Sequence, residues 1–216
     1  MQHDLFSTNG GSEPISLGAQ SGLLRGFALP LQDQLLDAIQ DIALEAPWRQ
    51  LFTPGGKPMS VRTTNCGTWG WHSDRQGYRY VAHDPHTGKP WPQLPELLQQ
   101  LARRAASQLG FSDFEADACL LNCYEPGAQM GLHQDRDEQS FAAPIVSVSL
   151  GLPAQFLWGG TQRNERPARI ELLHGDVVVW GGVDRLRFHG VAKLAAGKHP
   201  QLGAQRINLT LRHAGN

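Results

Sequence analysis

The chain has 216 residues, of which 40% are hydrophobic and 18% are charged, so its composition is that of a globular protein and excludes a disordered one. Its 19 Lys and Arg residues are balanced by 20 Asp and Glu residues, which excludes a global positive field, so that any contact with nucleic acid needs a local basic patch. The sequence has no apolar run of the roughly 20 residues that cross a bilayer and no secretory signal pattern, so we expect a cytoplasmic protein that does not bind membranes.

Two helices are predicted in the first half of the chain, after a polar, glycine-rich segment (residues 1–20) that we expect to fray or to lie on the surface. The first helix runs from about Leu31 to Glu45, where apolar side chains recur at helical spacing before Pro47. The second runs from about Pro95 to Leu109, because a proline suits the first helical turn and Gly110 suits the C-terminal cap.

The stretch from Thr53 to Trp91, between the two helices, is dense in Gly, Pro, Asn, Trp and Tyr. We predict that it is irregular. A stretch this long and aromatic on a small domain is more often functional than filler, so we expect it to contribute to a site.

From Ala118 onward the pattern changes to short strands separated by glycine-containing turns. The expected strands are 118–124, 145–150, 155–158, 169–173, 177–180, 187–190 and 207–212. Several short strands at such spacing indicate a sandwich or barrel. The fold class is therefore mainly β with flanking helices (α+β).

The three cysteines are an odd number and have no zinc-like pairing. Cys119 and Cys123 lie four positions apart in an apolar strand, so they point to the same side of it. We expect free, buried thiols in a reducing compartment.

His133 and Asp135 are candidate metal ligands, because side chains at i and i+2 of an extended backbone project to the same face. His189, at the end of the strand-like RLRFH, would complete a 2-His-1-carboxylate triad. Such a triad binds non-haem Fe(II) and leaves positions open for a co-substrate and O2. The alternative is a set of satisfied structural histidines, since a His-x-Asp pair alone is a weak signal.

A second His-x-Asp match consists of His174 and Asp176. Gly175 separates them and the apolar VVVW follows, which is typical of a turn before a strand. We therefore interpret this match as turn chemistry.

The segment RINLTLR alternates strictly, with Arg206, Asn208 and Arg212 on the polar face. One interpretation is a half-solvated surface strand. The other is a cradle for a small dianion, because guanidinium groups bind carboxylates with paired hydrogen bonds. Asn122 and Tyr124 of a neighbouring strand would add neutral donors, and the dicarboxylate that accompanies a triad iron is 2-oxoglutarate.

The sequence resembles the bacterial AlkB family of DNA-repair dioxygenases. The order and spacing of eight segments carry the resemblance from about Thr53 to Arg212: TPGGKPMSVRTTNCG, GWHSDRQGYRY, LLNCYEPGAQMGLHQDRDE, APIVSVSLGLPAQF, GGTQRN, HGDVVVWGG, RLRFHG and RINLTLR. Together these segments are far more specific than a His-x-Asp pair.

The resemblance implies a double-stranded β-helix (jelly roll) in one domain, residues 1–216, with a nucleotide-recognition region at about 53–91 and a catalytic core at about 115–213. It implies dependence on Fe(II), 2-oxoglutarate and O2. The implied reaction removes methyl groups from 1-methyladenine and 3-methylcytosine in DNA, single- or double-stranded, with RNA as a further substrate. The implied products are formaldehyde, succinate and CO2, and we expect a monomer.

Carried over by position, the resemblance implies iron ligands at His133, Asp135 and His189 and a co-substrate pocket at Asn122, Tyr124, Arg206, Asn208 and Arg212. It implies contacts with the base or its strand by Trp71, Tyr78, Asp137 and Arg163. Alkylated bases are cationic, so we expect the Asp137 carboxylate to favour them, unless it is only a surface charge. We also expect local phosphate contacts from four arginines, namely Arg62, Arg75, Arg79 and Arg163.

Tyr80 and Trp69 are either further stacking residues or packing residues. Lys57 and Thr63 depart from the best-known member of the family, which has bulkier side chains there, in the loop that covers the nucleotide; this leaves affinity and substrate preference open and the chemistry unchanged. Two other functions compete: an oxygenase of the same scaffold that acts on a small molecule or protein, and a non-catalytic jelly-roll binding module. The aromatic, basic stretch from Thr53 to Tyr80 argues against the first, and the complete ligand set argues against the second.

Overall fold

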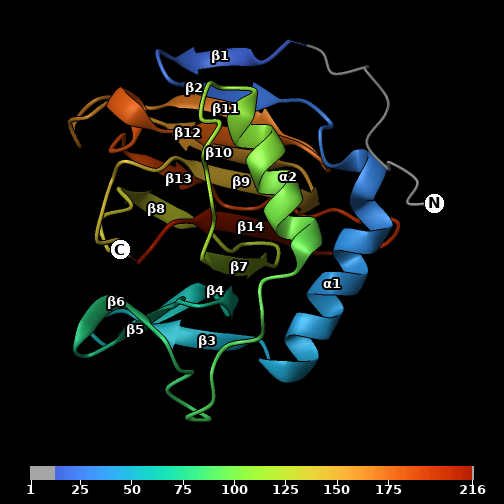
Figure 1. Ribbon diagram of the computed structural model, residues 1–216, viewed down its shortest axis with the longest axis vertical. Helices are drawn as coiled ribbons and strands as arrows, with labels where there is room; N and C mark the ends of the chain where they lie inside the picture. Colours follow the sequence, from blue (N-terminus) through green and yellow to red (C-terminus); the bar gives the residue numbers. More distant parts are fainter. Residues whose placement is uncertain (1–12, 216) are drawn as a thin grey trace.

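The structure is a computed structural model that describes residues 13–215, so the prediction for residues 1–12 falls outside the described part (Figure 1). The remainder of that segment lies on the surface, as predicted, but it does not fray, because the exposed or half-buried Ile15–Gly18 (β1) pairs with Ser21–Leu24 (β2). β2 is buried throughout and pairs in turn with Val177–Trp180 (β12) of the large sheet. Burial of the apolar side chains of Leu23 and Leu24 stabilises β2 in the sheet.

Both predicted helices are confirmed, as α1 (Gln32–Glu45) and α2 (Glu96–Ser107). A 3-10 turn, Leu29–Leu31, precedes α1. The apolar stripes of the helices pack into one core with the large sheet, for example through Leu35 and Leu98. Within residues 13–215 neither helix is long and apolar enough to span a membrane.

The largest unit is an eight-stranded sheet in which each strand pairs antiparallel with its neighbours (Figure 1). After β1 and β2 its order is β12 (Val177–Trp180), β9 (Ile145–Gly151), β14 (Arg206–Arg212), β7 (Ala118–Tyr124), β4 (Pro58–Gly67) and β3 (Arg49–Phe52). A four-stranded sheet contains β11 (Ala168–Leu172), β10 (Ala154–Trp158), β13 (His189–Val191) and β8 (Met130–His133). The 3-10 turn Gly182–Asp184 lies between β12 and β13. The predicted mainly β, jelly-roll class is confirmed.

The expectation of an irregular stretch from Thr53 to Trp91 is wrong. It contains β4, which pairs with β7, and a hairpin of β5 (Gly70–Asp74) and β6 (Gly77–Val81), at the lower left of Figure 1. Of the glycines and aromatic residues that suggested a loop, this hairpin contains Gly70, Trp71, Gly77, Tyr78 and Tyr80. The last predicted strand before β14 is also displaced, from 187–190 to His189–Val191.

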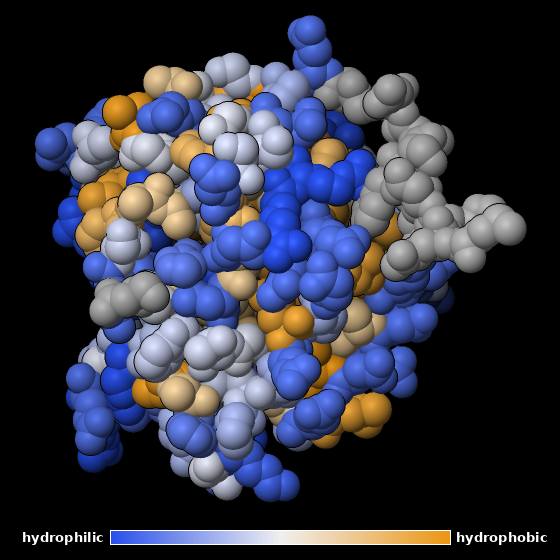
Figure 2. Space-filling model, in the orientation of Figure 1, coloured by the Kyte–Doolittle hydropathy of each residue, from blue (hydrophilic) through white to orange (hydrophobic). Residues whose placement is uncertain are grey.

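Each central strand has one face toward the helices and one toward a cavity. In β14, Leu209 and Leu211 belong to the helix-side core, whereas Arg206 and Asn208 line the cavity. All seven residues of β14 are buried, so the interpretation of a half-solvated surface strand is wrong. The outer face seen in Figure 2 is different, with small, separate hydrophobic groups among hydrophilic side chains, as expected of a face in contact with water.

Candidate metal centre and cavity

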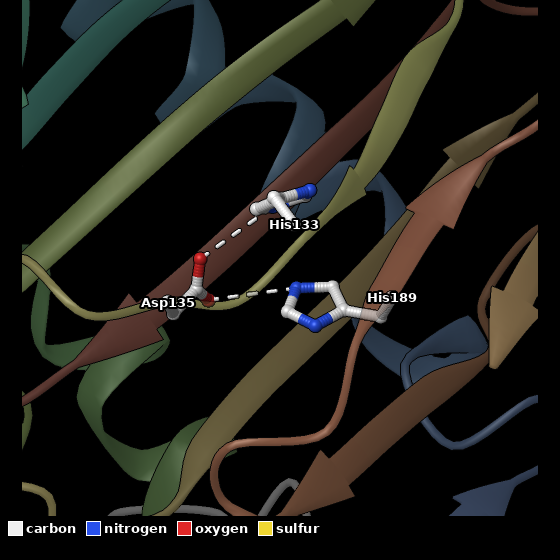
Figure 3. A group of neighbouring side chains, drawn as sticks. All are labelled: His133, Asp135 and His189. Atoms are coloured by element: carbon white, nitrogen blue, oxygen red, sulfur yellow. Dashed lines mark ion pairs between the residues drawn. The ribbon is translucent and has the colours of Figure 1, made fainter. Parts of the chain in front are cut away.

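Strand pairing brings the two candidate histidines together. β13 pairs with β8 so that His189 lies directly opposite His133. Gly190 permits this approach, because a Cβ there would lie 2.7 Å from the carbonyl oxygen of Met130. Asp135 follows β8 and points between the two rings (Figure 3).

The donor atoms of these three side chains all lie within 4.8 Å of one another. The Nε2 atom of His133 is 3.6 Å from Oδ1 of Asp135, and that of His189 is 3.7 Å from Oδ2. In each histidine Nδ1 faces a backbone carbonyl two residues earlier, at 2.9 Å for His133 and 3.1 Å for His189. Nδ1–H donation to these carbonyls leaves both Nε2 lone pairs free to bind a metal ion.

The electrostatics of the cluster favour the protonation states of metal ligands. Burial and the neighbouring His133 lower the pKa of His189 to about 4, so its imidazole is neutral at physiological pH. Burial alone would raise the pKa of Asp135. The Arg212 guanidinium and the two histidines outweigh it, so the pKa of this carboxyl lies below its usual range.

We expect the metal-free protein to lose stability as the pH falls from 6.5 toward 4. The unfolded chain takes up the His189 proton at about 6.5 and the folded chain only at about 4, so this stability is fully present above the higher value and is lost across the window. The loss is about 2 kcal/mol at about pH 5. Urea unfolding with a chelator at about pH 7.5 and about pH 5 measures it. Wild type should lose more than His189→Gln, and an equal loss in both would contradict the assignment.

A cavity of about 630 Å³ lies beside the triad. Asn122 and Tyr124 of β7 and Arg206, Asn208 and Arg212 of β14 line it, so the structure brings all five predicted co-substrate residues together. They alternate with core residues along paired strands, which aligns them on one face.

Arg206 is the residue of this face best placed to bind an anion. Its side chain is buried, 1% exposed, with the guanidinium over the Tyr124 ring at 4.9 Å and Nη2 donating to Ser149 Oγ at 2.8 Å. Its Nε and Nη1 atoms are buried without a hydrogen-bond partner. A buried, incompletely paired guanidinium is costly unless a ligand anion neutralises it. These unpaired donors fit an anion such as a carboxylate of 2-oxoglutarate.

Arg212 differs from Arg206, because it is already neutralised. Its Nη2 donates to Asp135 Oδ2 at 2.7 Å, and its Nε lies 3.1 Å from Glu138 Oε1. Tyr80 also donates its hydroxyl to Glu138 Oε1, at 3.3 Å.

The aromatic residues lie at the other part of the cavity, on the β5–β6 hairpin. Trp71, Tyr78 and Tyr80 share the face that lines the cavity. The rings of Trp71 and Tyr78 stack with centroids 5.6 Å apart, and Trp71 Nε1 donates to Asp137 Oδ2 at 2.7 Å. Lys57 also lines the cavity, whereas Thr63 is buried in β4.

Two predicted substrate residues do not line the cavity. Arg79 lies on the opposite face of the hairpin from Tyr78 and Tyr80 and forms a two-pronged ion pair with Asp74, at 2.7 and 2.8 Å. Arg163 is exposed, with its guanidinium 5.7 Å from the Phe188 ring. Trp69 is not among the lining residues either, which favours its packing role.

The second His-x-Asp match forms a turn, as predicted. Gly175 has a φ of +83°, which favours glycine, and Asp176 accepts hydrogen bonds from the backbone of Gly26 and Leu173. His174 is engaged by Gly151 N–H and by Gln32. The three cysteines are free and buried, also as predicted.

The sequence analysis missed Glu138, Arg185, Ser147 and Ser149, which surround the predicted residues. Glu138 follows Asp137 in the charged run DRDE, where a solvated surface charge was the alternative for Asp137, yet Glu138 is 6% exposed. The serines lie in the apolar strand β9, where their alternation with valines is the signal for a second polar face on the cavity.

Two imidazoles and a carboxylate between the sheets of a jelly roll, with an incompletely paired guanidinium in the same cavity, define the class of Fe(II)- and 2-oxoglutarate-dependent oxygenases. The comparisons with known proteins agree. Residues 20–212 match the model of the 2OG-Fe(II) oxygenase superfamily. The alpha-ketoglutarate-dependent dioxygenase AlkB of Escherichia coli K12 is 53% identical over 203 residues, which cover 94% of this chain and 93% of that protein. The chain belongs to the AlkB family of 2OG-Fe(II) oxygenases.

Two further relatives extend the comparison. The human nucleic acid dioxygenase ALKBH1 is 35% identical over 127 residues, which cover 59% of this chain and 31% of that protein. The solved structure of OsALKBH1 superposes with a TM-score of 0.79 at 26% identity, over 93% of this chain and 99% of that chain. As a member of its family the chain is a dioxygenase that uses Fe(II), 2-oxoglutarate and O2.

Proposed function

We propose that the chain repairs nucleic acids by oxidative dealkylation of N-alkylated bases, with 1-methyladenine and 3-methylcytosine in DNA as substrates and RNA as a further one. The observation that carries the proposal is a single cavity that joins the triad and Arg206 to a stacked pair of aromatic rings. The names of the E. coli and human relatives support it.

In this proposal His133, Asp135 and His189 bind the iron, and Asn122, Tyr124, Arg206, Asn208 and Arg212 hold 2-oxoglutarate. When bound, iron with 2-oxoglutarate and O2 supplies the oxidation of the alkyl carbon, with release of formaldehyde, succinate and CO2. The residues of the chain bind the two carboxylates, orient the base and exclude water. Arg206 binds the distal carboxylate, since its free donors are buried and fixed.

The substrate base enters from the hairpin side. Methyl groups on N1 of adenine and N3 of cytosine lie on the pairing edge, so the base must leave a duplex or come from a single strand. Because Trp71 and Tyr78 already stack on each other, the base stacks on the exposed face of this pair, where aromatic contact replaces about 1–3 kcal/mol of lost stacking. Arg79 and Arg163 lie outside the cavity and act on the phosphates of the strand rather than on the base.

The other parts of the proposal concern organisation. Residues 53–91 recognise the nucleotide and residues 115–213 form the catalytic core of one domain, which acts as a monomer. The free cysteines suit a reducing compartment, which supports action in the cytoplasm. Size-exclusion chromatography with light scattering tests the oligomeric state.

A substrate panel tests the proposed function. The protein with Fe(II), 2-oxoglutarate and O2 is given single- and double-stranded DNA and RNA oligonucleotides that carry 1-methyladenine or 3-methylcytosine. We expect mass spectrometry to show loss of the methyl group together with formation of succinate. Succinate formation that metabolites or peptides stimulate, and methylated oligonucleotides never do, would overturn the proposal in favour of another substrate class.

Asp137→Asn extends this panel. Asp137 lies on the cavity, and its carboxylate favours a cationic methylated base over a neutral etheno adduct. We expect the substitution to lower kcat/KM for 1-methyladenine by about tenfold, that is about 1.4 kcal/mol, and to leave ethenoadenine turnover within about threefold. The amide still accepts the Trp71 hydrogen bond, so the aromatic pair is retained. Equal losses on both substrates would show that Asp137 acts only through Trp71.

A further inference from the structure

The segment that carries Asp135 has little support from the sheet. β8 ends at His133, and no helix or strand is formed between it and the start of β9 at Ile145. Asp135 nevertheless is only 9% exposed and points at the two histidines. Contacts other than strand pairing must therefore hold its backbone.

Arg185 supplies these contacts. Its side chain is 3% exposed and comes from the connection that leads from β12 to β13. Nη1 donates to the backbone carbonyl of Asp135 at 3.0 Å, and Nε donates to that of Ala143 at 3.2 Å. Nη2 lies 3.2 Å from Glu138 Oε2 as an ion pair, and the guanidinium lies over the Phe141 ring at 5.4 Å. One planar group thus contacts the segment between β8 and β9 at four points.

A second path leads from Arg185 to the Asp135 carboxylate. Glu138 is 6% exposed, and its Oε1 lies 3.1 Å from Nε of Arg212, whose Nη2 binds Asp135 Oδ2 at 2.7 Å. The order Arg185, Glu138, Arg212, Asp135 alternates positive and negative charges. Because two cations balance two anions, the cluster is neutral before any metal ion binds, which limits the cost of burying it.

The same connection also carries the other buried ligand. His189 lies four residues after Arg185, and the Gln134 side-chain amide donates to the carbonyl of Leu186 within that connection. Two contacts, one from Arg185 and one from Gln134, therefore connect the segment that bears Asp135 with the segment that bears His189.

We propose that Arg185 is a positioning residue for the metal centre. It holds the main chain of Asp135 directly and its carboxylate through Glu138 and Arg212, and it links both to the segment of His189. This inference rests on the metal site of the proposed function but not on the nucleic-acid substrate.

The role requires a guanidinium. Three donor directions in one plane reach Ala143, Asp135 and Glu138 at once, whereas an ammonium at the end of a lysine side chain keeps the charge but cannot span these acceptors. Outer partners of metal ligands typically contribute 10- to 100-fold to metal affinity.

Mn(II) binding under anaerobic conditions tests the proposal without any turnover. Electron paramagnetic resonance of the free ion measures the Kd for Mn(II). We expect Arg185→Lys to raise this Kd by about 10- to 100-fold and to alter the spectrum of the bound ion. Arg49→Lys is the matched control, because Arg49 pairs with the buried Asp84 at 2.7 Å and is not among the cavity residues. It should change the melting temperature and not the Mn(II) affinity.

The outcomes are distinct. If Arg185→Lys is folded and binds Mn(II) as tightly as wild type, the proposal is wrong. Where this variant does not fold, Glu138→Gln decides, since it removes only the second path: a Kd at least about threefold above wild type supports the proposal, and an unchanged Kd overturns it. A wild-type protein that binds no Mn(II) would instead refute the metal site itself.

Discussion

His133→Ala is expected to abolish turnover, with a fall in succinate formation of at least about 10³-fold, or about 4 kcal/mol in the activation free energy. The substitution removes one of three groups that converge within 4.8 Å, and apart from His189 no other imidazole of the described chain belongs to this cluster. The fold should persist, because the His133 side chain is 35% exposed and its hydrogen bond, to the carbonyl of Gly131, is local. The experiment measures metal affinity, the rate of succinate formation and the melting temperature of the variant.

His174→Ala is the matched control for this experiment. His174 belongs to the other His-x-Asp match, at the turn before β12, and bonds to Gly151 and Gln32 rather than to the triad. It should lower the stability modestly, by about 1–3 kcal/mol for the unpaired partners, and leave the turnover of folded protein unchanged. Turnover that survives in His133→Ala would show that the ligand assignment is wrong.

Arg206→Gln is expected to have its largest effect on 2-oxoglutarate. The buried guanidinium has unpaired donors for a carboxylate, and truncation of one partner in such a buried pair costs about 2–5 kcal/mol. The KM for 2-oxoglutarate should therefore rise by about 30-fold or more. Initial rates at varied 2-oxoglutarate and saturating oligonucleotide measure it.

Arg206→Lys separates charge from geometry at the same position. It retains the positive charge and loses the fork that binds both carboxylate oxygens, so we expect a KM between those of wild type and the Gln variant. Mn(II) affinity without 2-oxoglutarate should be unchanged in both variants, since the Arg206 side chain bonds to Ser149 rather than to the triad. A KM within about threefold of wild type in Arg206→Gln would assign the distal carboxylate to another residue.

Periodicity was sufficient where one face of an element meets the core. The stripe that includes Leu35 and Ile39 predicts α1 to within a residue, and the alternation in RINLTLR predicts β14. It was insufficient in β4 to β6, where glycines, aromatic residues and polar side chains fill a strand and a hairpin that line a cavity. Such strands have no continuous apolar face, because the face toward the cavity carries polar and aromatic side chains instead of core residues.

Motifs and spacing allowed the triad, the co-substrate residues and the family to be predicted, since side chains at i and i+2 of a strand share a face wherever the strand lies. Motifs and spacing did not predict which polar faces of the strands are buried. Only the packing of the two sheets encloses Arg206 and places Glu138 and Arg185 behind Asp135. These contacts join residues about 50 or more positions apart, and the physics of burial and charge pairing that fixes them depends on surroundings that no local pattern contains.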